Sequence, residues 1–247
     1  MKRIFCLGSI YLLLTATTLF ATAFDDANRQ YQSGNFSEAA ATYEKILVSE
    51  GPRAAVFYNL GNSYQSLKQY GPAILAYERA RLLAPRDRDL RTNLALARKA
   101  SGSFEGIGNN PRLEAALVYL SRDEWSWLSA GAALIFGAVI LLCGSVRLPR
   151  RMYSLAGVIA GAAGLLIVTG AAVLHLRRGE SSKGIILFEN ATVRLSPFDK
   201  AESLGILGPG SVVRLGVKSG NFQYVEASGT NVQGWLADKE VAAVVPR

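Results

Sequence analysis

The chain has 247 residues, of which 27 are basic and 19 acidic, and its formal net charge is +8. This length allows roughly one to three domains, at about 100–200 residues each. The excess positive charge lies mainly beside apolar segments, with three arginines in residues 147–151 alone, so it favours a membrane as partner and argues against nucleic-acid binding.

The chain opens with a segment typical of secretory signals. Residues 2 and 3 are basic, residues 4–20 are apolar, and a small-x-small sequence follows at 21–23. This order predicts a signal peptide over residues 1–23 that is cleaved after Ala23, with an uncleaved anchor helix as the alternative. In both cases the chain from Phe24 onward lies outside the cytoplasm.

A repeated pattern runs through residues 24–100. Apolar residues at helical spacing predict two antiparallel helices in each unit, and Pro85 ends the second unit because proline disfavours helix in the residue before it. Residues 89–100 then predict the first helix of a third unit, left single as a cap. The second unit carries the pattern at Phe57, Leu60, Gly61, Tyr64, Tyr70, Ala73, Tyr77, Ala80 and Pro85, and the first unit at Ala27, Gly34, Phe36, Ala39 and Tyr43.

This pattern resembles the tetratricopeptide repeat, which packs two helices into a period of about 34 residues. Gly61 and Ala73 are small where the two helices must touch, and Tyr77 fills the space beyond them. The first unit matches less well, because Ile46 stands where the repeat usually has alanine. The resemblance predicts an all-α repeat domain over residues 24–100.

In this repeat class the first helix of each unit lines a concave groove. A side-chain amide offers both a donor and an acceptor, so stacked asparagines can hold the backbone of an extended peptide. An alternative is that Asn59 and Asn93 brace neighbouring units instead. The resemblance implies a peptide-binding groove formed by Asn28, Tyr31 and Gln32 of the first unit and Tyr58, Asn62 and Gln65 of the second.

Residues 101–124 form a linker between the repeats and the next apolar segment. Asparagine followed by proline at 110–111 suits a helix start, and Leu113, Leu117 and Leu120 form a stripe. The linker therefore contains a predicted short amphipathic helix, which lies against the membrane or against the repeats.

Two apolar segments, residues 125–146 and 152–176, are each longer than the ~20 residues that a helix needs to cross a bilayer. The turn between them, residues 147–151, is rich in arginine and is predicted to be cytoplasmic. Gly157 and Gly161 are spaced for close helix contact, either within this hairpin or with a partner's helix. We therefore expect a two-span protein of a bacterial inner (cytoplasmic) membrane with both soluble parts in the periplasm.

The last part of the chain, residues 184–247, reads as short strands rich in valine and aromatic residues and broken by Gly, Pro, Asn and Ser. Five strands within about 65 residues predict a small all-β barrel. The sequences TVRLSP at 192–197, GPGSVVRL at 208–215 and GWL at 234–236 resemble the bacterial SH3-like domain. In so small a domain, Trp235 is expected in the core, with a ligand platform as the alternative.

Catalytic and metal-binding patterns are missing from the sequence. The lone histidine, His175, lies at a membrane edge, and there is no GxSxG, HExxH or phosphate-loop motif. Cys6 lies in the signal peptide and Cys143 in an apolar segment, which excludes an intramolecular disulfide and a cysteine metal site. We expect a protein that is not an enzyme and holds no metal or cofactor.

The order of signal peptide, repeats, two-span hairpin and SH3-like barrel resembles the BatE-type aerotolerance proteins. The resemblance is carried by AN at 27–28, YNLGNSY at 58–64 and AILAYERARLLAP at 73–85. That family is associated with operons that encode a MoxR-type ATPase and von Willebrand A-domain membrane proteins, and with tolerance of oxygen stress.

The resemblance implies a non-enzymatic scaffold that gathers such partners at the periplasmic side of the membrane. A rival hypothesis is a cell-wall protein whose barrel binds peptidoglycan while its repeats recruit wall enzymes. A third is an accessory protein that holds exported chains in the groove.

Overall fold

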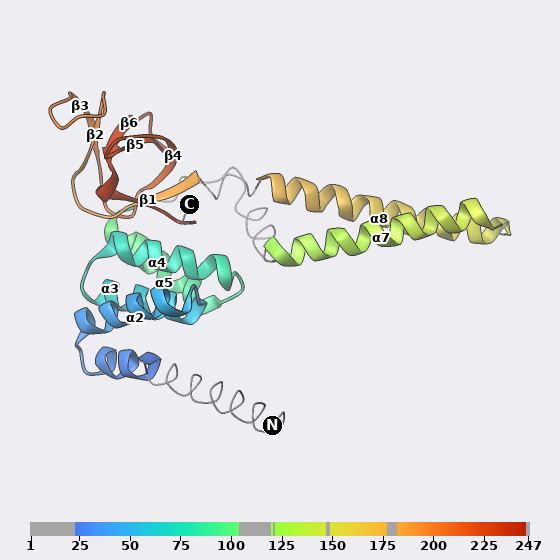
Figure 1. Cartoon of the computed structure of the whole chain (residues 1–247), viewed down its shortest axis with the longest axis horizontal. Helices are drawn as coiled ribbons and strands as arrows, with labels where there is room; N and C mark the ends of the chain where they lie inside the picture. The colour runs from blue at the N-terminus through green and yellow to red at the C-terminus, as the bar shows by residue number, and fades with distance from the viewer. Residues whose placement is uncertain (1–22, 104–119, 121, 147–148, 177–181, 246–247) are drawn as a thin grey trace, which may run out of the picture. The chain divides into compact units, whose positions relative to one another are not determined.

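A computed structural model describes residues 23–103, 120, 122–146, 149–176 and 182–245. These residues form two compact units (Figure 1): the helical repeats together with the strands, called here the repeat–sheet unit, and a pair of long helices, the hairpin unit. Most of the predicted signal peptide, the predicted helix at 110–119 and the centre of the predicted turn lie outside the described residues.

The helical repeats follow the period of the sequence. After a helix over residues 23–32 come α2 (Phe36–Glu50), α3 (Ala54–Ser66), α4 (Tyr70–Leu83) and α5 (Arg88–Ser101). The starts of α2 and α4, and those of α3 and α5, are each one sequence period apart. Gly34 and Lys68 occupy the same turn in successive units, and both have positive φ, at 81° and 59°. Within the described residues, two helix pairs and then α5 follow this period, so the helical repeats that the sequence predicts are present.

The contact between α3 and α4 shows why the repeat needs small residues. Ala73, Tyr77 and Ala80 are completely buried. An ideal Cβ at Gly61 would lie only 2.6 Å from the Tyr77 ring, so a larger residue there would push the two helices apart. Pro85 follows the end of α4 at Leu83.

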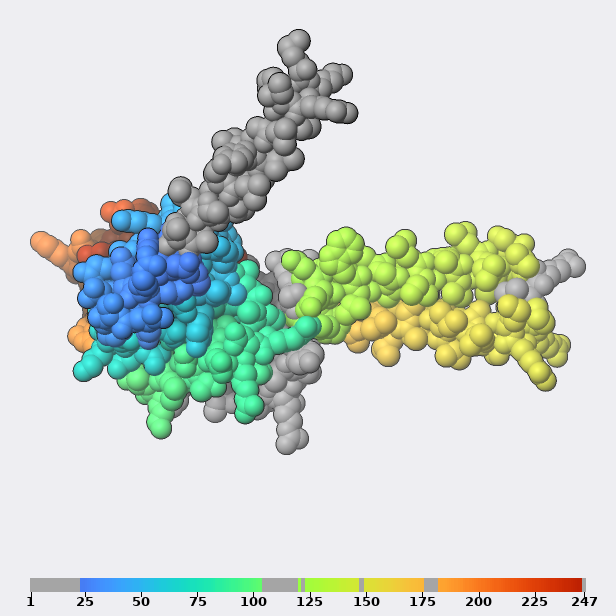
Figure 2. Space-filling view, turned by 90° about the horizontal axis from the view of Figure 1, so that it is seen from below, coloured from blue at the N-terminus to red at the C-terminus, as the bar shows by residue number. Residues whose placement is uncertain are grey.

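The hairpin unit consists of α7 (Arg122–Ser145) and α8 (Arg150–Leu176), which run side by side (Figure 2). Both are long and apolar enough to cross a membrane. They approach closely where Gly170 meets Ser129, because an ideal Cβ at Gly170 would collide with the Ser129 side chain. Gly157 and Gly161, in contrast, have no neighbour within 4 Å of an ideal Cβ, so this pair does not contact α7.

The last part of the chain is an antiparallel sheet in the order β3-β2-β6-β5-β4-β1-β7. The predicted all-β character is confirmed, but there are seven strands and not five. The edge strands β3 and β7 do not pair with each other, so the predicted closed barrel is open at this point. The strands are β1 (Lys183–Ile186), β2 (Ala191–Arg194), β3 (Ser203–Leu207), β4 (Val212–Ser219), β5 (Phe222–Ala227), β6 (Gln233–Ala237) and β7 (Val241–Ala243).

The sheet packs directly on the helical repeats, through β1 and the residues around β7. Ile185 and Val244 share one hydrophobic core with Phe57 and Ile74 of the repeats. At the start of α4, an ideal Cβ at Gly71 would lie 2.6 Å from the Ile186 carbonyl oxygen, so the helix and strand backbones are almost in contact. We did not expect this contact from the sequence.

Candidate functional site

A small hydrogen-bond network joins the first three helices of the repeats. The Asn28 Oδ1 atom accepts a hydrogen bond from the Tyr43 hydroxyl at 2.6 Å. It also accepts one from Asn59 Nδ2, on the first helix of the next unit, at 2.9 Å. One amide oxygen thus ties its own unit to the following one, and Asn59 braces neighbouring units as the alternative hypothesis proposed.

The same network recurs in the next unit. Asn62 Oδ1 accepts from the Tyr77 hydroxyl at 2.7 Å and from Asn93 Nδ2 at 3.0 Å. The Tyr77 hydroxyl also lies 3.0 Å from Gln65 Oε1, and Asn93 Nδ2 lies 2.9 Å from the Tyr58 hydroxyl. Successive units therefore share both the arrangement of their helices and the orientation of these polar side chains.

These hydrogen bonds use the side-chain oxygens of Asn28 and Asn62 and leave the side-chain nitrogens free. In the described part of the chain, the Nδ2 groups of Asn28 and Asn62 have no hydrogen-bond partner, while their oxygens are fully engaged. Because an asparagine side chain carries two N–H donors, each of these amides can still donate to an outside carbonyl group. We call the surface formed by Asn28, Tyr31, Gln32, Tyr58, Asn62 and Gln65 the amide face.

The remaining members of the amide face differ in their surroundings. Gln32 is exposed. The Tyr31 hydroxyl lies 3.5 Å from Ser66 Oγ, and its ring meets the Phe36 ring edge-on. The Tyr58 ring packs against Tyr77 with centroids 6.0 Å apart. The predicted residues thus lie on the first helices of adjoining units, which the asparagine bridges hold side by side.

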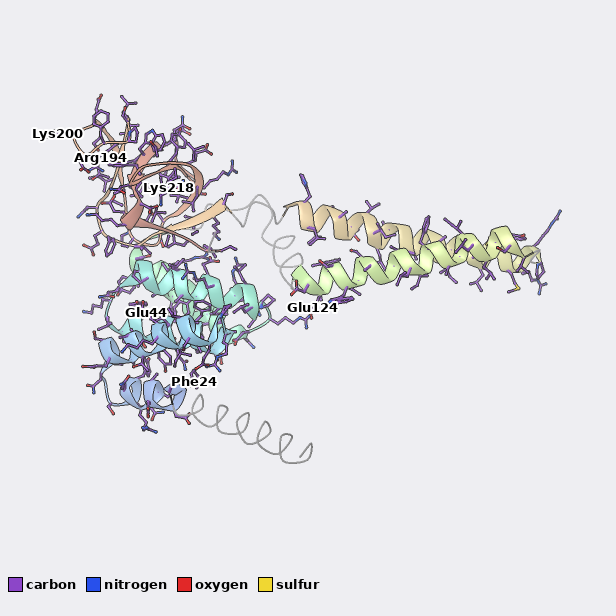
Figure 3. The ribbon with its side chains drawn as sticks, viewed as in Figure 1. Phe24, Glu44, Glu124, Arg194, Lys200 and Lys218 are labelled. Carbon is purple, nitrogen blue, oxygen red and sulfur yellow. The ribbon has the colours of Figure 1, made fainter. Side chains whose placement is uncertain are left out.

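Tyrosines in the repeats are held in the neutral form. Burial raises the pKa of Tyr77, and burial together with the hydrogen bond and charge of Glu44 raises the pKa of Tyr64 well above its usual value. Glu44 comes from α2 (Figure 3), and the Tyr64 hydroxyl donates to its carboxylate. Tyr77 thus links the two helices of its own unit, and Tyr64 links α3 to α2 of the preceding unit, by donating hydrogen bonds that ionisation would abolish.

We expect the repeats to lose stability as the pH rises above about 10, where tyrosines in an unfolded chain ionise but these do not. Below pH 10 this contribution is fully present. Guanidinium unfolding of the purified chain, followed by near-UV circular dichroism at pH 9 and pH 11, measures the loss. Tyr64→Phe should reduce the difference between the two pH values, and an unchanged difference would show that Tyr64 does not cause it.

A second polar cluster lies where the sheet meets the repeats. The Glu78 carboxylate of α4 is fully buried, with 0% of its side chain exposed. It pairs with Arg81 at 2.8 Å, with Lys183 of β1 at 3.3 Å, and with Arg98 of α5. Burial raises the pKa of this carboxyl, but Lys183, Arg81 and Arg98 outweigh it, so the pKa lies well below its usual range.

Arg79, the next residue of α4, binds backbone atoms of the sheet through its side chain. Its guanidinium donates to the carbonyl oxygens of Ala243 at 2.9 Å and Val244 at 3.2 Å. Sequence reasoning missed this interface. One sequence signal was available: residues 73–77 read AILAY, and a helix that is apolar on every side needs partners on every side.

The sheet carries a shallow hollow of its own. The Tyr224 ring at its edge meets the half-buried Trp235 ring edge-on, with centroids 5.5 Å apart. Trp235 packs against this neighbouring ring but is not among the residues of the sheet's hydrophobic core, where it was expected. The hollow is lined by Leu195, Leu204, Tyr224, Asn231, Val232, Gln233 and Gly234.

The loop beside this hollow is fixed by an arginine. The Arg194 guanidinium donates to the carbonyl oxygens of Thr192 at 2.8 Å and Asp199 at 3.3 Å. Arg194 and Lys200 lie close together at this end of the sheet (Figure 3). Arg194 therefore uses its donors to hold the loop.

No family model matches the chain. Among curated proteins, the anaphase-promoting complex subunit cut9 of Schizosaccharomyces pombe is 34% identical over 83 residues, which is 34% of this chain and 12% of that protein. Since cut9 is a tetratricopeptide-repeat protein, the match supports a tetratricopeptide-like identity for the helical part.

Among solved structures, the crystal structure of the Yersinia enterocolitica type III secretion translocator chaperone SycD (alternative dimer) is similar with a TM-score of 0.33 and 19% identity. The match covers 59% of this chain and 92% of that chain. A similarity at this score supports no further argument. The period of the helices and the match to cut9 support a tetratricopeptide-like array in the helical part, an architecture suited to protein–protein interaction.

Proposed function

We propose that this chain is a non-enzymatic scaffold that binds extended segments of partner proteins on its amide face. The observation that carries the proposal is the orientation of Asn28 and Asn62. Their oxygens are held by tyrosine and asparagine donors, and their Nδ2 groups remain available. Two donors at equivalent positions of successive units suit the regularly spaced carbonyl groups of an extended peptide.

The proposal places the scaffold in a bacterial inner membrane. The signal-like start, the two apolar helices and the arginines at 147–151 together favour a hairpin whose soluble parts are both periplasmic. The resemblance to BatE-type proteins extends the proposal to an SH3-like identity for the sheet and to partners among von Willebrand A-domain membrane proteins, within an assembly that serves aerotolerance.

A substitution at Asn62 separates binding from folding. Asn62→Asp keeps an oxygen that can accept from Tyr77 and Asn93, but it removes the free N–H donors. Losing one hydrogen bond of about 0.5–1.5 kcal/mol should weaken partner binding several-fold while the melting temperature changes little. Asn62→Ala, which also leaves Tyr77 and Asn93 without their acceptor, should weaken binding and lower the melting temperature.

The measurement is quantitative co-purification of partners with the full chain from detergent-solubilised membranes, alongside thermal unfolding. Asn221→Asp, at an exposed position of the turn between β4 and β5, adds the same charge away from the amide face. If Asn62→Asp retains partners as well as Asn221→Asp does, the amide donors do not bind peptide.

One observation supports the alternative hypothesis that the sheet binds peptidoglycan. The hollow beside Tyr224 combines an aromatic ring with the side-chain amides of Asn231 and Gln233, a mixture suited to sugar hydroxyls and short peptides. Sedimentation of the full chain with purified peptidoglycan tests it. Co-sedimentation that is lost in Tyr224→Ala would favour this second function for the sheet.

A further inference from the structure

The outer surface of α5 forms a shallow hollow with a single sign of charge. Its cations, Arg88, Arg91 and Lys99, are all exposed, and the apolar Leu96 between them is 51% exposed. In the described part of the chain, none of the three cations has an ion-pair partner. We call this surface the basic face; it consists of Arg88, Arg91, Thr92, Ala95, Leu96 and Lys99.

Comparison of α5 with the equivalent helix α3 of the preceding unit shows which residues the cations replace. Arg91 holds the position in α5 that Phe57 holds in α3, where Phe57 packs in the core against α4, and Lys99 holds the position of Gln65. Within the described residues, no second helix follows α5 to cover the corresponding surface. A terminal unit of a repeat array needs a polar outer surface for solubility, and this requirement accounts for the loss of Phe57's counterpart.

Solubility does not account for the sign of the charge. Residues 23–87 carry seven basic and seven acidic residues, so their charges cancel, whereas α5 carries four basic residues and one acidic residue. Like charges close together on a helix destabilise it, and a mixture of signs would be equally soluble. The concentration of positive charge on α5 therefore points to an anionic ligand.

The chain connection points to the nature of that ligand. Only six residues separate Leu176, at the end of α8, from Lys183, at the start of β1. Even a fully extended segment of that length spans no more than about 25 Å. Once α8 is in a bilayer, the repeat–sheet unit is thus held near the bilayer surface, where anionic headgroups attract basic residues.

We infer that the basic face of α5 binds the headgroups of anionic phospholipids in the membrane that anchors the chain. Arg88, Arg91 and Lys99 pair with the phosphates, and Leu96 contacts the interface. This inference rests on the membrane anchoring in the proposed function, but it does not depend on peptide binding. Its consequence is that the repeats lie down on the membrane surface through their last helix.

The test uses the full chain, with Cys6→Ser and Cys143→Ser, labelled with a fluorescent dye through Ala100→Cys, an exposed position of α5 outside the basic face. The chain is reconstituted in vesicles of phosphatidylcholine alone or with phosphatidylglycerol added, and energy transfer to a headgroup-labelled lipid is recorded. Because the tether alone keeps the unit near the bilayer, some transfer is expected in both kinds of vesicle; we expect it to rise clearly when phosphatidylglycerol is present, and the rise to be lost at high salt. Each cation is expected to raise the ratio of docked to undocked repeats about five-fold. The triple variant Arg88→Gln/Arg91→Gln/Lys99→Gln should therefore reduce this ratio on the order of 100-fold.

A charge-matched control is Lys45→Gln/Lys68→Gln/Lys239→Gln, which removes three exposed cations elsewhere. This variant should keep the transfer, and so should Arg88→Lys/Arg91→Lys. Equal transfer in both kinds of vesicle, or equal loss in both triple variants, would overturn the inference. Transfer that requires an added acidic protein and not anionic lipid would also overturn it, in favour of a protein ligand.

Flotation of the vesicles in alkaline carbonate tells a failure of the basic face apart from a failure of the membrane anchor. A chain that stays with the vesicles but shows no lipid-dependent transfer contradicts the basic face alone. A chain that leaves the vesicles contradicts the membrane anchor of the proposed function, and the inference fails with it.

Discussion

Replacing Glu78 with glutamine is expected to destabilise the repeat–sheet unit by about 3–5 kcal/mol, because removal of one partner of a buried ion pair leaves the others uncompensated. Glu78 is fully buried and faces Arg81, Arg98 and Lys183, which come from two helices and a strand. A neutral amide cannot balance three cations there. The effect should therefore be much larger than that of any exposed ion pair in the chain.

The loss is measured by guanidinium unfolding of the full chain in detergent, followed by near-UV circular dichroism at pH 7. The control is Glu226→Gln, which breaks an exposed pair with Arg214 at 3.5 Å and should cost no more than about 1 kcal/mol. A Glu78→Gln variant as stable as Glu226→Gln would show that the cluster does not hold the sheet to the repeats.

The pH dependence of this effect has a definite sign. Because the pKa of Glu78 is lowered in the folded state, the carboxylate contributes its full stability above the unfolded value of about 4.3. That stability is lost only as the pH falls from there toward the lower folded value. The difference between the wild-type chain and Glu78→Gln should thus stay constant between pH 6 and pH 8 and shrink in acid.

Gly71→Ala is expected to loosen the sheet from α4 and to destabilise the unit by about 1–3 kcal/mol. The added methyl group would meet the carbonyl oxygens of Ile186 and Leu187, which are backbone atoms and cannot rotate away. The helix or the strand must shift as a whole, and the bonds from Arg79 to Ala243 and Val244 would weaken with it.

Hydrogen exchange of the full chain shows where the loss occurs. Amides of β1 and β7 should exchange faster in Gly71→Ala, while those of α2 keep their protection. The matched control is Gly208→Ala, because an ideal Cβ at Gly208 has no neighbour within 4 Å. Unchanged exchange in β1 and β7 of Gly71→Ala would mean that the close approach at Gly71 does not matter for the contact.

The helical part could be predicted from sequence because its period is local. Gly61, Tyr77 and Pro85 mark a helix contact and a helix end within a single unit, and the pattern they belong to recurs from one unit to the next. The amide face was predicted for the same reason. What the pattern did not indicate is that the oxygens of Asn28 and Asn62 are already bonded, so that only their nitrogens are available.

The contact between sheet and repeats could not be predicted in this way. Glu78 and Lys183 are 105 residues apart, and neither has a sequence environment that identifies the other. The number of strands was also underestimated by two, since β3 is mostly exposed and has glycine at its centre, and β7 has only three residues. Long-range packing decides both features, and a single sequence carries little information about it.

Photo-cross-linking in living cells tests the central claim, partner binding on the amide face, most directly. A photo-reactive amino acid is placed at the exposed Gln32 of the amide face and, as a control, at the exposed Lys45 of α2. We predict discrete cross-links to partner proteins from position 32 that become several-fold weaker in the Asn62→Asp background, and none of these from position 45. Absence of cross-links at position 32, or the same products from both positions, would contradict the scaffold function proposed for this chain.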